Sequence, residues 1–331
     1  MLSEEAIFER RQSDWRELQR LLGRCNGNFK VLSEDELQTF VRLYRQTSAD
    51  LAYLMTHSSN QEVVDYLNAL VGQAYAELYR APRRPFLTVI QDSLVSVAQV
   101  VRRRRVAIRV AMVIFFAGIV VSYGLIQSSP GYLEMFVPPG MEETFEHWKS
   151  GEHEERTGIQ GIGASFFYAQ HNPLVSIVTA ALSLVTVGIF GVSSMWGNGA
   201  MMGALLHEVV LAGQAGFLIF SVIPHGITEI GGIFMAGAAG FVMAGAIINP
   251  GRDSRAEALR KAGKDGFVLV ILSLVMTMMA APIEGFFSFD PRVPDWARIV
   301  VAAVTLFGWL AFFRLYGRDK ESLEGAESPS R

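Results

Sequence analysis

Apolar residues recur with helical spacing over the first hundred positions. One stripe at intervals of three and four residues marks a single helix face. It consists of Trp15, Leu18, Leu21 and Leu22. Ser33, followed three residues later by Glu36, has the pattern of a capping box and predicts the start of a second helix. A third apolar stripe runs from Val63 to Tyr75. We therefore expect residues 1–101 to form a helical domain.

After residue 101 the pattern changes to long apolar runs. Val110–Leu133 contains 24 residues without a charge, and Thr157–His207 contains 51 positions without Asp, Glu, Lys or Arg. Because about 20 apolar residues suffice to cross a bilayer, these runs exclude a purely soluble protein. The sequence predicts an all-α, polytopic membrane helix bundle over residues 102–316, with about six spans. The predicted spans are 106–127, 174–195, 201–223, 225–248, 266–287 and 299–315.

The joins between these spans are predicted from turn and breaker residues. Residues 157–170, which include neighbouring aromatic residues and glycines, are expected to form an interfacial helix. Asn198-Gly199 is expected to form the turn between the second and third spans. Pro224 is expected to open the fourth span, because proline is tolerated in a first helical turn. The span 201–223 contains His207 and Glu208, so a five-span version with a re-entrant segment stays open.

Charge predicts how the bundle is oriented. Residues 128–173 hold two basic and seven acidic side chains, whereas the loop 251–265 holds five basic and three acidic ones. Four consecutive arginines, at 102–105, precede the first span. Since basic residues beside spans stay in the cytoplasm, we expect residues 1–101 and a disordered tail at 317–331 to lie there. The net charge of −3 argues against nucleic acid as a partner.

Ionisable residues within the predicted spans are costly in lipid and are expected to face other helices. They are Glu208, His225, Glu229 and Glu284. At 100° per residue, His225 and Glu229 share an arc of about 120° with a ladder of small residues that favours close helix packing. This ladder consists of Gly232, Ala236, Gly240 and Ala244. The fifth span has a similar small and polar face that ends in Glu284, so we expect these two faces to pack together.

The predicted topology also places several polar residues at one depth. His225 and Glu229 come at the outer start of the fourth span, and Glu284 comes at the outer end of the fifth. His171 and Asn172 precede the second span, which also starts outside. We therefore expect these five residues to form a polar cluster in the outer leaflet, and Glu208 to lie apart from it. Such a cluster can serve as a structural clasp, an ion or proton path, or a metal site.

Several short motifs resemble the stage II sporulation protein M family. In the membrane region they are His171-Asn172-Pro173, Asn198-Gly199, Pro224-His-Gly-x-x-Glu229 and Pro282-Ile-Glu-Gly-Phe286. In the amino-terminal region they are Leu43-Tyr-Arg, Ser48-Ala-Asp-Leu-Ala52 and Tyr66-Leu-Asn-Ala-Leu-Val71. The resemblance covers roughly residues 5–315. It implies a multipass protein of the cytoplasmic (plasma) membrane of a bacterium that acts with protein partners in the cell envelope, and it implies no catalytic residue.

These features predict a non-enzymatic membrane scaffold that couples cytoplasmic and envelope partners, without a cofactor. Association of the chain with itself is left open, and membrane lipid is a further partner. The alternative is a transporter or channel for a small ion or solute that uses the buried residues His225, Glu229 and Glu284. A second alternative is an intramembrane metal site at the same residues, although the sequence has no His-Glu-x-x-His zinc helix.

Overall fold

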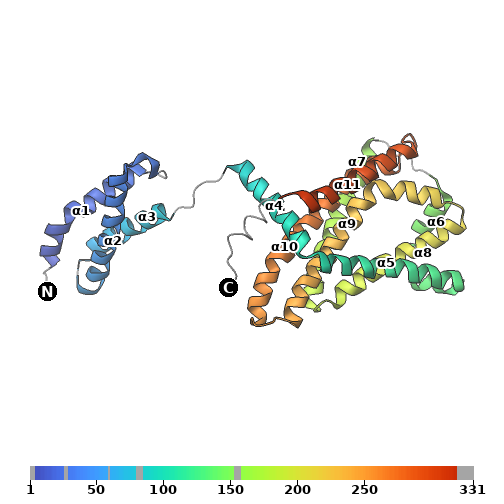
Figure 1. Cartoon of the computed structure of the whole chain (residues 1–331), viewed down its shortest axis with the longest axis horizontal. Helices are drawn as coiled ribbons and strands as arrows, with labels where there is room; N and C mark the ends of the chain where they lie inside the picture. Colours follow the sequence, from blue (N-terminus) through green and yellow to red (C-terminus); the bar gives the residue numbers. More distant parts are fainter. Residues whose placement is uncertain (1–3, 26–28, 59, 80–84, 153–157, 319–331) are drawn as a thin grey trace. The chain divides into compact units, whose positions relative to one another are not determined.

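The protein is helical throughout the part of the chain that the structure describes. The computed structural model describes residues 4–25, 29–58, 60–79, 85–152 and 158–318, and no strand occurs within them (Figure 1). The chain divides into two compact units, Met1–Phe86 and Leu87–Arg331. The predicted all-α fold class is therefore confirmed. The predicted tail at 317–331 lies outside the described residues from position 319 onward.

The first unit consists of three α-helices around one apolar core. They are α1 (Glu4–Cys25), α2 (Glu34–His57) and α3 (Gln61–Leu78), with a short 3₁₀ turn, η1 (Phe29–Val31), between the first two. Three of the four residues of the predicted stripe on α1 are fully buried against residues of α2 and α3, and Leu22 is partly buried. The core includes Trp15, Leu18, Leu21, Phe40, Leu43, Leu54, Leu67 and Leu70. The Trp15 indole also donates a hydrogen bond to Asp50 Oδ2 at 3.0 Å, which joins α1 to α2.

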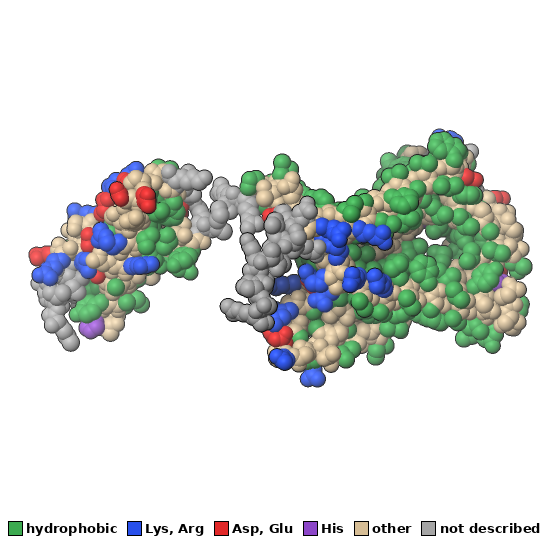
Figure 2. Space-filling view, in the orientation of Figure 1, with side chains coloured by type: hydrophobic (Ala, Val, Ile, Leu, Met, Phe, Trp, Pro, Cys, Tyr) green, Lys and Arg blue, Asp and Glu red, His purple; other side chains and the backbone are tan. Residues whose placement is uncertain are grey.

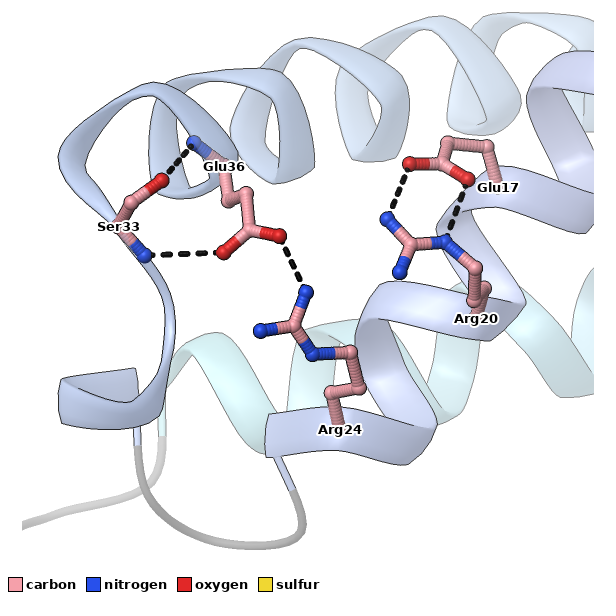
Figure 3. Close-up of polar contacts among 5 residues, drawn as sticks. All are labelled: Glu17, Arg20, Arg24, Ser33 and Glu36. Carbon is pink, nitrogen blue, oxygen red and sulfur yellow. Dashed lines mark hydrogen bonds and ion pairs between the residues drawn. The ribbon is translucent and has the colours of Figure 1, made fainter.

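Figure 3 shows the predicted capping box at the start of α2. The Ser33 hydroxyl accepts from the Glu36 backbone N–H at 3.2 Å, and the Glu36 carboxylate accepts from the Ser33 N–H at 3.0 Å. Arg24, near the end of α1, pairs with the same carboxylate. The Ser33 N–H, and next the Arg24 guanidinium, lower the pKa of Glu36 below its usual value. One carboxylate thus closes the α2 amino terminus and ties it to α1.

We expect Glu36→Gln to loosen the first turn of α2, because Gln keeps the size but loses the charge-assisted bonds. Hydrogen exchange of the full-length protein should show faster exchange over residues 34–38 than in the wild type. Since the pKa is lowered on folding, the contribution of Glu36 is complete above the unfolded value of about 4.5 and disappears as the pH falls through the lowered value. Glu17→Gln, which removes only an exposed pair with Arg20, is the control. Equal exchange in both variants would contradict this account.

The second unit contains eight α-helices among the described residues, together with a 3₁₀ helix and a π-helix. The α-helices are α4 (Phe86–Arg103), α5 (Arg105–Ser128), α6 (Glu142–Ser150), α7 (Gly158–Val185), α8 (Ile189–Leu211), α9 (Ala215–Ile248), α10 (Arg255–Pro282) and α11 (Asp295–Leu315). The 3₁₀ helix η2 spans Pro130–Met135, and the π-helix η3 spans Ile283–Ser288. Four segments are long and apolar enough to cross a membrane: α5, α9, α10 with η3, and α11. Helices α7 and α8 pack among them.

The predicted domain boundary at residue 101 differs from the division in the structure. Nearly all of α4 belongs to the second unit, because its apolar face is buried there. Val100 and Val101 share a core with residues of α9 and α10, such as Ala239 and Leu269. Helix α4 is therefore part of the membrane unit and not of the amino-terminal helical domain.

The predicted turn at Asn198-Gly199 is wrong, since both residues lie inside α8. The chain turns instead between α7 and α8, where Val187 (φ 51°) and Gly188 (φ 96°) adopt left-handed conformations. Gly199 serves a different purpose. A Cβ atom there would lie 2.0 Å from the backbone oxygen of Phe115, so the glycine allows α8 to touch the α5 backbone.

Two further boundaries also differ from prediction. The segment 157–170 is not a separate interfacial helix: from Gly158 onward it is the first part of α7, which continues through Pro173 and packs against η3. Pro224 does not open a helix, because α9 begins at Ala215 and contains it. As a result α8 ends near Glu208, and a Glu208 oxygen lies 3.7 Å from Lys149 Nζ in α6. Glu208 therefore lies in the last turn of its helix, beside α6, and not near the start of a span 201–223 as predicted.

Candidate functional site

A cluster of polar side chains lies where α7, α9 and η3 meet. Asn172 comes from α7, His225 and Glu229 come from consecutive turns of α9, and Glu284 and Ser288 come from η3. We call these five residues the polar cluster. Its place in the fold depends on close packing, because a Cβ atom at Gly285 would lie 2.0 Å from Ser165 Oγ of α7. The π-helix η3 follows directly after Pro282, and such segments often occur at functional sites.

The cluster is joined by polar contacts between helices. Asn172 Nδ2 donates to Glu229 Oε1 at 2.8 Å, and His225 Nδ1 lies 2.7 Å from Ser288 Oγ. The other imidazole nitrogen, Nε2, lies 3.7 Å from Glu229 Oε2. His225, Glu284 and Ser288 are buried, and Glu229 is partly exposed. The spacing of four residues between His225 and Glu229 places both side chains on one face of α9.

Helix α9 starts ten residues earlier than predicted, which changes the position of the cluster along it. At 1.5 Å per residue, His225 lies about 15 Å from the first residue of the helix, and Glu229 lies about 21 Å from it. The two side chains are therefore inside the helix and not in its first two turns. Pro224 removes one backbone N–H immediately before them and so leaves a helix carbonyl without its usual donor.

The ladder of small residues on α9 contacts two different helices. Gly232 faces α10, where its oxygen accepts from Ser273 Oγ at 2.6 Å. Gly240 faces α7, since a Cβ atom there would lie 2.3 Å from the Ser183 Cβ. Ala236 and Ala244 are both buried. The packing predicted between the fourth and fifth spans thus occurs at Gly232, whereas Gly240 lies against the helix of the predicted second span.

His171 is not brought into the cluster. Its ring is exposed and stacks on Phe167, with centroids 5.3 Å apart and an interplanar angle of 10°. Adjacent residues of a helix point about 100° apart, so α7 directs Asn172 toward Glu229 and His171 away from it. Sequence reasoning missed Ser288, whose only signal was its spacing of four residues from Glu284.

The loop after η3 is held by ionic contacts outside the cluster. Arg298, buried in the first turn of α11, donates to the Asp290 carbonyl at 2.8 Å and to Asp295 Oδ1 at 3.1 Å. Arg292 donates hydrogen bonds to the Asp290 carboxylate and lowers the pKa of that group to about 2. Asp290 therefore stays ionised at any physiological pH, and the loop that leads from η3 to α11 keeps this anchor.

The polar cluster contains three residues of types that bind metals. One ligand atom from each of His225, Glu229 and Glu284 lies within 4.8 Å of the other two. Two atoms bound to one zinc ion are separated by at most about 4.4 Å, given bonds of about 2.0–2.2 Å. Small side-chain movements therefore suffice to bring all three onto one ion. If His225 Nδ1 carries the proton and donates a hydrogen bond to Ser288 Oγ, the unprotonated Nε2 faces Glu229 with its lone pair free for a metal.

Comparisons with known families cover both units. The model described as "Domain of unknown function (DUF8413)" matches residues 5–80, and the model described as "Stage II sporulation protein M" matches residues 111–289. Searches among curated proteins and among solved structures found no match. The second match extends over more than half of the chain and contains every residue of the polar cluster. The apolar helices and this match show a multipass membrane protein. The chain belongs to the stage II sporulation protein M family.

Proposed function

We propose that this protein is a non-enzymatic membrane scaffold that holds a soluble partner and an envelope partner together. The observation that carries the proposal is the division into two units. Residues 1–86 have their own core, centred on Trp15 and Phe40, whereas the second unit contains the membrane-crossing helices. A folded soluble unit on a polytopic anchor suits a protein that binds partners on different sides of a membrane.

The surface of the first unit offers a place for the soluble partner. Tyr75 and Tyr79 are exposed at the end of α3, and their ring centroids lie 4.6 Å apart. Exposed tyrosines supply large contact areas at low entropic cost and are common in protein interfaces. We assign the soluble partner to this aromatic pair.

Site-specific photo-crosslinking in native membranes tests the scaffold proposal. A photoreactive residue at Tyr75 of the full-length protein should give a discrete adduct with another protein. The same residue at Gln61, an exposed polar position of the same helix, should not. Recovery of the uncrosslinked protein alone from both positions would count against the proposal, and so would identical adducts from both.

We also propose that both chain termini face the cytoplasm. The basic segments 102–105 and 251–265 meet at one end of the membrane unit, where their residues line a common cavity. Helix α6, which belongs to the acidic segment 128–173, lies instead beside the end of α8. This arrangement agrees with the rule that basic residues remain in the cytoplasm.

Cysteine labelling should report opposite compartments for these two ends. In a Cys25→Ser background, Glu143→Cys should react with an impermeant maleimide in intact cells, whereas Arg252→Cys should react only after lysis. Both positions are exposed, so differences in reactivity report the compartment and not burial. Equal labelling of both in intact cells would refute the orientation.

The geometry of the polar cluster favours a second candidate function, the binding of a divalent cation. Imidazole and carboxylates are ordinary ligands of such ions, and three of them converge from α9 and η3. Membrane proteins also use buried His and Glu side chains to move ions. A cation here would join two elements on which the packing of the bundle depends.

Metal analysis of the purified full-length protein tests this candidate. We expect about one divalent ion per chain, reduced several-fold in Glu229→Gln and Glu284→Gln. Glu208→Gln, which changes a partly buried carboxylate outside the cluster, is the control and should retain the ion. Substoichiometric metal in the wild type would remove the candidate. Flux measurements in liposomes then decide whether a bound cation crosses the membrane.

A further inference from the structure

A cavity of about 530 Å³ lies at the basic end of the membrane unit. It is bordered by the start of α5, the end of α9 and the start of α10. Its walls are of two kinds. Arg103, Arg104 and Lys261 supply positive charge on the polar side, which also includes Asn249 and Asp253, and the apolar side includes Val106, Val110 and Phe241. A cavity with one cationic wall and one apolar wall matches an amphiphilic anion.

The positive wall is held in place by ion pairs but remains accessible. Arg103 donates two hydrogen bonds to Asp265, at 3.0 and 2.5 Å, and Arg104 donates one at 2.7 Å. Lys261 Nζ lies 2.8 Å from Asp253 Oδ2. The side chains of Arg103, Arg104 and Lys261 are nevertheless 53%, 35% and 56% exposed. They can therefore contact a ligand without first leaving a buried position.

Charge around the cavity exceeds what the local carboxylates neutralise. Segments 102–105 and 251–265 together hold nine basic residues and three acidic ones, an excess of six. Beside the cavity, the Asp265 carboxylate accepts hydrogen bonds from the guanidinium groups of Arg103 and Arg104. These three side chains together carry one net positive charge. Figure 2 shows Lys and Arg side chains gathered at one end of the membrane unit, directly beside apolar surface. This end has the charge that attracts a phosphate group.

The apolar wall continues onto the membrane-facing surface of α5. Val106 and Val110 are one helical turn apart and are both exposed. They begin the segment that is apolar enough to cross a membrane. An acyl chain that runs along this face would bring its headgroup to the arginines, because Arg104 and Val106 are only two residues apart. A free inorganic anion would leave the apolar wall unused.

We propose that this cavity binds the headgroup of an anionic phospholipid, with its phosphate between Arg104 and Lys261 and its acyl chain along Val106 and Val110. Basic pockets between membrane helices are suited to such headgroups. The bound lipid would bridge the α4–α5 corner and the start of α10, and so reinforce the contacts made through Asp265. This inference does not depend on the scaffold proposal, because it concerns only the membrane unit.

Lipid titration of the full-length protein in a neutral detergent tests the proposal, with native mass spectrometry as the readout. Phosphatidylglycerol should bind, and phosphatidylcholine should bind much more weakly. Lys261→Gln should weaken the binding of phosphatidylglycerol about five-fold, the factor that corresponds to about 1 kcal/mol per basic residue. Arg260→Gln is the matched control, since it also removes an exposed cation paired with Glu257 but lies outside the cavity. It should leave binding unchanged.

A second variant tests the cavity itself. A Cβ atom at Gly245 meets nothing within 4 Å, so Gly245→Leu should fold normally and fill part of the cavity. It should abolish lipid binding without lowering the thermal stability of the lipid-free protein. Equal weakening by Lys261→Gln and Arg260→Gln would show diffuse attraction and overturn the proposal. Equal binding of phosphatidylcholine, or full competition by millimolar inorganic phosphate, would also overturn it.

Discussion

Gly199→Ala is expected to destabilise the membrane unit more than its single added methyl group suggests. The new Cβ atom would lie 2.0 Å from the backbone oxygen of Phe115 and 2.8 Å from its carbonyl carbon. Since backbone atoms cannot rotate away, α5 and α8 must separate along their crossing. Neighbouring glycines prevent a local adjustment, because Gly118 and Gly203 also touch the opposite helix. Overpacking typically costs about 1–3 kcal/mol of stability, and we expect a clash with backbone atoms to cost about 3 kcal/mol or more.

Thermal unfolding in detergent, followed by the loss of the monodisperse peak, measures this effect. The matched control is Gly197→Ala on the same helix, where a Cβ atom meets nothing within 4 Å. That change should be neutral or slightly stabilising, because alanine costs less entropy than glycine in a helix. If both variants unfolded at the same temperature, the contact between α5 and α8 would not have the importance that we give it.

Gly240→Leu is expected to prevent recovery of folded protein, whereas Glu229→Leu should give protein that is weakened but folded. The Gly240 Cβ position lies 2.3 Å from the Ser183 Cβ, so a leucine there would force α7 away from α9. Replacing Glu229 removes one acceptor of Asn172 and a neighbour of His225 without adding bulk. The loss of one partly buried hydrogen bond costs about 1–3 kcal/mol.

Yield and thermal stability of the two purified variants distinguish these outcomes. Gly245→Leu places the same side chain on the same helix in open space and should behave like the wild type in lipid-free detergent. A larger loss in Glu229→Leu than in Gly240→Leu would mean that the polar cluster, and not the ladder of small residues, holds α9 in place.

Local patterns predicted the features that depend on one helix alone. The stripe around Trp15 and the Ser33–Glu36 capping box both occur in the structure. The shared face of His225 and Glu229 follows from helix geometry, and the structure places Glu284 beside them. The stripe, the cap and the shared face are local to one helix and survive almost any tertiary arrangement, whereas the expectation for Glu284 also needed the predicted topology.

Features that depend on two helices were not predictable in the same way. Asn-Gly is a common turn sequence, but Gly199 is used for contact with α5, and only the tertiary structure reveals that partner. The actual turn at Gly188 lies in an apolar run with no Pro or Asn to mark it. The turn lies about ten residues earlier than predicted. The observed ends of α8 and α9, and the position of Glu208, therefore differ from the predicted ones. No sequence pattern predicted the π-helix that brings Ser288 within hydrogen-bonding distance of His225.

Helix α9 is longer than a bilayer is thick. Its 34 residues extend for about 51 Å, whereas the hydrocarbon region measures about 30 Å and the whole bilayer about 40–45 Å. The helix must therefore bend, lie oblique to the membrane normal or project beyond the lipid, and its inclination should change with bilayer thickness. Thinner membranes would incline it further and shift Glu229 relative to Asn172 of α7. The acyl-chain length of the surrounding lipids thus becomes a variable to which the geometry of the polar cluster responds.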